Sequence, residues 1–92
     1  MKHAGSDALD AIEDLLVSLR QRSALRERKR GIFYLQSRSF LHFHEDPAGI
    51  FADVSHAGDM VRLRVQIQRE RKTLLAHVDA ILGPLEPIDR SG

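Results

Sequence analysis

The sequence predicts a single α+β domain, a four-stranded antiparallel meander with an N-terminal and a C-terminal helix packed on one face (α-β-β-β-β-α). Apolar residues recur at helical spacing near both ends of the chain and alternate with polar residues through its centre. The hydrophobic fraction of 42% and the charged fraction of 29% are those of an ordinary globular chain. We expect residues 1–84 to form this domain and residues 85–92 to form a flexible C-terminal tail.

The first helix is expected to begin at Ser6, with acidic residues in its early turns where the helix dipole favours negative charge. Its apolar face contains Leu9, Ile12, Leu16 and Leu19. Ser23 occupies the next position on this face, so the helix should end between Arg20 and Ser23. The alternative is a solvated extension of the helix through the basic run that ends at Arg30.

Four strands are expected between the helices, at residues 32–35, 38–44, 50–54 and 60–67. Asp46-Pro47-Ala48-Gly49 has the residue types of a type I turn, so the second and third strands should form a hairpin. The turn at Gln36-Ser37 lacks the glycine that a tight hairpin prefers.

Residues 60–67 alternate most regularly, which favours a strand. The alternative is a long C-terminal helix that Asp59 caps and that includes Met60, Leu63 and Ile67 on its apolar stripe. From Glu70 onward the pattern is helical in both interpretations, and Gly83-Pro84 should end the helix.

The alternation assigns side chains to the two faces of the sheet. The face under the helices should contain Leu41, Phe43, Ile50, Ala52, Val54, Val61, Leu63, Val65 and Ile67. The open face should contain Tyr34, Arg38, Phe40, His42, His44, Phe51, Asp53, Arg62 and Arg64. Large aromatic side chains are unusual on a solvated sheet face and indicate a binding surface.

Three functions compete for that surface. The first is association, as a homodimer or with a protein partner, because small domains gain missing burial in this way. The second is binding of single-stranded nucleic acid, with bases stacked on the aromatic rings and phosphates bound by arginines. The residues expected to serve either function are Tyr34, Arg38, Phe40, Phe51, Arg62 and Arg64.

The third function is binding of a divalent metal ion. His42 and His44 lie at positions i and i+2 of one strand, so their side chains project to the same side about 7 Å apart. Asp53 has the matching parity on the neighbouring strand. Imidazole and carboxylate groups are common ligands of transition metals.

The composition and motifs of the chain exclude several classes of chemistry and indicate where the protein is located. The chain has no cysteine, which excludes disulfides and thiolate chemistry, and its net charge is only +1. It has no phosphate-binding glycine loop and no nucleophile motif, so we expect a non-enzymatic protein with no catalytic residues and no cofactor beyond a possible metal ion. With no apolar run long enough to cross a membrane and no signal peptide, a cytoplasmic location is expected.

The block Arg38-Ser39-Phe40-Leu41-His42-Phe43-His44-Glu45-Asp46-Pro47, followed by Gly49 and Ala52-Asp53-Val54, resembles one found in small bacterial proteins that are described as hypothetical. The resemblance covers about a quarter of the chain. It implies a shared fold and a shared surface, but no catalytic or ligand residues.

Overall fold

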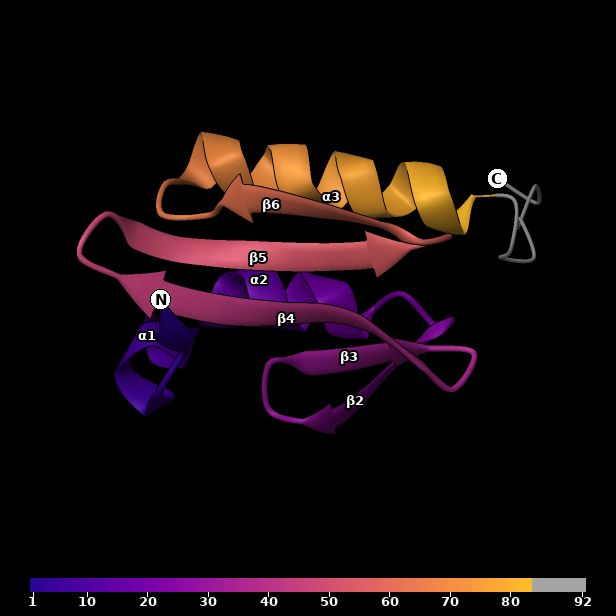
Figure 1. Cartoon of the computed structure of the whole chain (residues 1–92), viewed down its shortest axis with the longest axis horizontal. Coiled ribbons are helices and arrows are strands. Elements are labelled where there is room, and N and C mark those ends of the chain that lie inside the picture. Colours follow the sequence, from indigo (N-terminus) through magenta and orange to yellow (C-terminus); the bar gives the residue numbers. More distant parts are fainter. Residues whose placement is uncertain (84–92) are drawn as a thin grey trace.

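The computed structural model of the chain describes residues 1–83, and the expected tail at 85–92 lies outside these residues. The described elements, labelled in Figure 1, are β1 (Lys2–His3), α1 (Ser6–Ala11), α2 (Glu13–Arg20), β2 (Leu25–Lys29), β3 (Ile32–Leu35), β4 (Arg38–Asp46), β5 (Gly49–His56), β6 (Asp59–Arg64) and α3 (Gln68–Leu82). None of the described helices is long and apolar enough to span a membrane.

The predicted α+β class with an antiparallel sheet is confirmed, but the prediction of four strands was wrong. The sheet has the order β2-β3-β4-β5-β6, and β1 pairs with β4 beyond the end of β3. The two additional strands are β1 and β2. The run 20–30, expected to be a loop or a helical extension, contains β2, a charged edge strand of the type that discourages pairing between sheets.

One hydrophobic core joins the helices to the sheet. Ile12, Leu16 and Leu19 are fully buried, as their helical spacing predicted. The first helix is interrupted at Ile12, which separates α1 from α2. In Figure 1, α2 passes behind the central strands while α3 runs alongside β6, and Leu74 and Val78 of α3 belong to the same core as α2.

The expected core positions of the sheet are mostly buried. Those with little or no exposure are Leu41, Phe43, Ile50, Ala52, Val54 and Val65. Val61 and Leu63 are only half-buried. Ile67 is 40% exposed, so its assignment to the core was wrong. The cause is that β6 ends at Arg64 and alternation no longer applies at residue 67.

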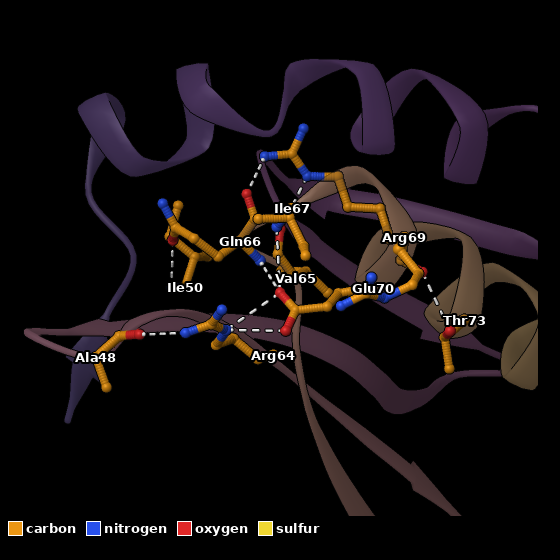
Figure 2. A network of polar contacts seen from close by, with 10 residues as sticks. Ala48, Ile50, Arg64, Val65, Gln66, Ile67, Arg69, Glu70 and Thr73 are labelled. Carbon is orange, nitrogen blue, oxygen red and sulfur yellow. Dashed lines mark hydrogen bonds and ion pairs between the residues drawn. The ribbon is translucent and has the colours of Figure 1, made fainter.

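Strand β6 and helix α3 are joined by a network of polar contacts (Figure 2). The Glu70 carboxylate accepts hydrogen bonds from the backbone N–H groups of Gln66 and Ile67, which would otherwise be unpaired at the helix start. The same carboxylate pairs with Arg64, at 2.9 Å. These contacts explain why the chain forms strand β6, a short connection at residues 65–67 and then helix α3, rather than one long helix.

A β-bulge places Phe40 in the core. The register between β3 and β4 passes from Phe33↔Leu41 to Tyr34↔Ser39, which leaves Phe40 as an extra residue in β4. Phe40 is only 1% exposed and belongs to the hydrophobic core. Its predicted position on the open face was therefore wrong, because strict alternation does not hold across a bulge.

Candidate metal centre

Three histidines come together on the open face of the sheet. His42 and His44 lie on β4, as expected, and β1 pairs with this strand so that His3 lies opposite His44. The ring centroids are 4.9 Å apart for His3 and His44, 4.8 Å for His42 and His44, and 5.8 Å for His3 and His42. One nitrogen atom from each ring can be chosen so that all three lie within 4.8 Å of one another.

Two of these rings have a buried nitrogen atom without a partner. The Nδ1 atoms of His42 and His44 are inaccessible to solvent and make no hydrogen bond. Buried polar atoms nearly always have a partner, and leaving one unpaired costs about 1–3 kcal/mol. The two nitrogen atoms therefore make the space between the rings a candidate ligand site.

Asp53 orients one of the histidines. Its register on β5 places it opposite His42, and its Oδ2 lies 3.1 Å from His44 Nε2. A neutral His44 with its proton on Nε2 donates that proton to the carboxylate, which leaves a lone pair on Nδ1. A carboxylate that fixes a histidine in this way is a common partner of metal-binding imidazoles.

Arg62 keeps the Asp53 carboxylate ionised. Its Nε and Nη2 donate to the two carboxylate oxygens at 2.6 and 2.9 Å. These hydrogen bonds hold the pKa of Asp53 below its ordinary value. Burial, followed by the proximity of His44, lowers the pKa of His42 below its ordinary value of 6.5. At neutral pH the centre thus combines an anionic Asp53 with a neutral His42, the protonation states that metal binding requires.

The donor geometry is close to that of a metal site but more open. Zinc–imidazole bonds of 2.0–2.1 Å in a tetrahedron place the nitrogen atoms about 3.3 Å apart. The nitrogen atoms here, up to 4.8 Å apart, need to approach by about 1.5 Å at most, a change that side-chain rotation can supply. Three protein ligands leave one position of the tetrahedron open.

The structure separates most of the remaining predicted site residues. Arg64 belongs to the network at the start of α3, where it pairs with Glu70 and donates to the Ala48 carbonyl (Figure 2). Phe51 is half-buried and pairs with both His44 and Arg64 in the sheet register. Tyr34 on β3 and Arg38 at the start of β4 lie nearer the opposite end of the sheet, close to the β3–β4 turn.

His3 is the candidate ligand that sequence reasoning missed. A two-residue strand has no periodicity, and nothing in the sequence near residue 3 predicts pairing with residue 44. Asp53 was expected to be a metal ligand, but the structure places it behind His44 and in contact with Arg62.

Comparison of the chain with protein-family models, curated proteins and solved structures finds no match.

Proposed function

We propose that this protein binds a divalent transition-metal ion, with Zn²⁺ as the best fit, through His3, His42 and His44. The observation that carries the proposal is the pair of buried, unpartnered Nδ1 atoms inside a cluster of three imidazoles. Imidazole nitrogen is a preferred ligand of zinc and neighbouring transition metals, whereas calcium and magnesium require oxygen ligands. Asp53 acts behind the ligands, where it orients His44 and offsets part of the metal's charge.

The centre ties the beginning of the chain to the middle of the sheet. Strand β1 has two exposed residues, while a few contacts, such as the hydrogen bond from the Ala4 N–H to the Phe43 carbonyl, hold this segment to β4. A metal ion bound to His3, His42 and His44 would cross-link this segment to β4. Metal binding should therefore raise the stability of the whole domain, because the unfolded chain does not preassemble the site.

The direct test is thermal unfolding of metal-free protein with and without Zn²⁺. At a free concentration of 100 times Kd, one bound ion adds about 2.7 kcal/mol, or a rise in Tm of about 10 °C or more for a domain of this size. Titration calorimetry should give one ion per chain. His3→Ala, His42→Ala and His44→Ala should each remove most of the shift.

His77→Ala is the matched control, because His77 lies on α3, away from the cluster, and the substitution should leave the Zn²⁺ response unchanged. An equal shift in all four variants would mean that zinc binds elsewhere. No shift in the wild-type protein with Zn²⁺ or Co²⁺ would reject the proposal.

Association through the open face remains a second hypothesis, now without Phe40. The aromatic side chains left for it are Tyr34 and Phe51, both half-buried within one chain. Light scattering measures the molar mass of the wild-type protein and of Phe51→Ser in solution. A wild-type dimer that becomes a monomer in Phe51→Ser would support this hypothesis.

A further inference from the structure

The arginines of the described chain differ in whether a carboxylate neutralises them. Those with a carboxylate partner are Arg20, Arg22, Arg30, Arg62, Arg64 and Arg71. Within residues 1–83, no ion pair involves Arg26, Arg28, Arg38 or Arg69. Arg26 and Arg28 lie on the edge strand β2, where Arg28 is the extra residue of a bulge, and both side chains line one pocket.

The Tyr34 side chain lies next to both arginines. In the register of β2 and β3, Arg26 lies directly opposite Tyr34. The guanidinium carbon of Arg28 lies over the Tyr34 ring, 4.8 Å from its centroid. An arginine stacked on an aromatic ring is held flat and keeps its N–H donors available at its edge.

A pocket of about 470 Å³ opens beside this pair. Its polar lining consists of Ser23, Arg26, Arg28, Tyr34, Gln36 and Ser37. The volume is within the range of sites for small organic ligands. The pocket therefore offers cationic donors, an aromatic surface, two serine hydroxyl groups, the tyrosine hydroxyl group and an amide within one space.

We propose that this pocket binds a nucleotide unit, with its phosphate on Arg26 and Arg28 and its base against the Arg28–Tyr34 stack. Guanidinium groups form bidentate hydrogen bonds with phosphate oxygens. Aromatic rings and arginine planes stack on any base. Hydroxyl and amide groups can bind the sugar or the base edge. A single nucleic-acid strand or a free mononucleotide would supply this same unit.

This site is independent of the metal centre. It uses β2, β3 and the β3–β4 turn, whereas the histidines lie on β1 and β4 beyond the bulge at Phe40. It also differs from the nucleic-acid surface that the sequence predicted. Two arginines of that surface, Arg62 and Arg64, are paired with Asp53 and Glu70.

The test is fluorescence anisotropy of a labelled mixed-sequence single-stranded octamer, titrated with metal-free protein at 50 mM salt, and calorimetry with each mononucleotide. Binding of the octamer should weaken as salt rises, with a slope near −0.7 for each phosphate contacted. The double variant Arg26→Ala/Arg28→Ala should lose at least tenfold in affinity. Tyr34→Ala should lose roughly 5- to 150-fold, as expected for one stacked base, while Tyr34→Phe should bind normally.

Arg69→Ala is the matched control, since Arg69 is another exposed arginine without a carboxylate partner among the described residues, but lies on α3. It should bind like the wild type. Arg28→Lys keeps the charge and the strand but removes the planar group, so a loss there tests the stack even if the double variant does not fold. Binding of mononucleotides as well as the octamer would identify the free nucleotide as a sufficient ligand, and binding of the octamer alone would identify the strand.

The proposal is overturned if neither probe binds at 50 mM salt, or if Arg69→Ala loses as much affinity as the double variant. Equal binding by the wild type and the double variant would also overturn it.

Discussion

The two ends of the open sheet face differ in whether their arginines are paired with a carboxylate of residues 1–83. At one end Arg62 donates two hydrogen bonds to Asp53, which also contacts His44, so cation, anion and imidazole form a closed network. At the other end Arg28 rests on Tyr34, and no carboxylate in the described residues pairs with it or with Arg26. The first end is where we propose that a metal cation binds, and the second is where we propose that a phosphate binds.

This difference shows that the net charge of the chain does not describe how charge is distributed over its surface. The whole chain has a charge of only +1, because 14 lysines and arginines nearly balance 13 aspartates and glutamates. Carboxylates pair with six of the described arginines. Examples are Glu13 with Arg20 and Asp14 with Arg71. The charges left over on one face, and their spacing, carry the information about ligands.

Phe40 separates the two ends, and its substitution should have the largest effect. Because the ring is 1% exposed in the core, Phe40→Glu leaves a cavity and buries a carboxylate. We expect a loss of more than about 4 kcal/mol, enough to unfold a domain of this size. Circular dichroism and urea unfolding measure it. A folded, stable Phe40→Glu protein would return this residue to the open face, where alternation alone had placed it.

Asp53→Ala removes the carboxylate partner of Arg62, so that this arginine would lack an ion pair within the described residues, as Arg28 does. Asp53 is 2% exposed, but the Arg62 side chain is 44% exposed and can regain water. The cost should therefore lie below the range for fully buried pairs, at about 2 kcal/mol. The variant should also bind Zn²⁺ some 10- to 100-fold more weakly.

The comparison for Asp53→Ala is Arg28→Ala, which should cost about 1 kcal/mol or less, because it removes only one exposed cation–π contact. Chemical unfolding of both variants without metal gives the two values. Equal losses of stability in Asp53→Ala and Arg28→Ala would contradict the view that only the Arg62 end depends on a carboxylate.

Acid should weaken the histidine end in two steps. The pKa of His42 is lowered from 6.5 in the folded chain, so below pH 6.5 the unfolded chain binds the proton first and the free energy of unfolding falls. The pKa of Asp53 is lowered from 3.8, so its contribution is present above pH 3.8 and is lost as the pH falls through the folded value. Urea unfolding of metal-free protein across this range measures both steps.

Each step has a variant that should remove it. His42→Gln should abolish the step that begins below pH 6.5, and Arg62→Ala should reduce the step that begins below pH 3.8. If the free energy of unfolding of the wild type stays constant from pH 7 to pH 5, then His42 does not titrate as the structure indicates.

Ser37→Gly should have the smallest effect and the opposite sign. Gln36 and Ser37, in the turn beside the arginine pocket, have φ values of 51° and 70°, a conformation that costs most residues roughly 1–2 kcal/mol and glycine almost nothing. The substitution should raise stability by about 1 kcal/mol. Ser39→Gly, in the adjacent strand, should lower it by about 0.5–1 kcal/mol. A destabilised Ser37→Gly would mean that the hydroxyl group is needed in the turn.

Sequence alternation predicted the regular strands and failed where regularity ends. On β4 and β5, Phe43, Ala52 and Val54 are buried as expected because an unbroken ladder preserves the period of two. Phe40 was assigned to the wrong face because a bulge depends on the partner strand, and residue 40 has no local feature that marks it. Strand β2 was missed because its charged residues, which suit an edge, are also typical of a loop.

The candidate metal centre was predicted in part for the same reason. His42 and His44 share a strand, so their spacing alone places them together, whereas His3 reaches them only through a pairing across 41 residues of chain. The pairing of Asp53 with Arg62 follows from the β5–β6 register. Sequence parity had placed both residues on the same face without linking them.

Strand β1 should also determine how quickly an ion enters and leaves the proposed metal centre. It contributes one of the three imidazoles, yet its side chains are exposed and do not belong to the core. Its detachment from β4 would leave the packed sheet and helices in place. We therefore expect exchange of the ion to follow this local opening and to be much faster than global unfolding.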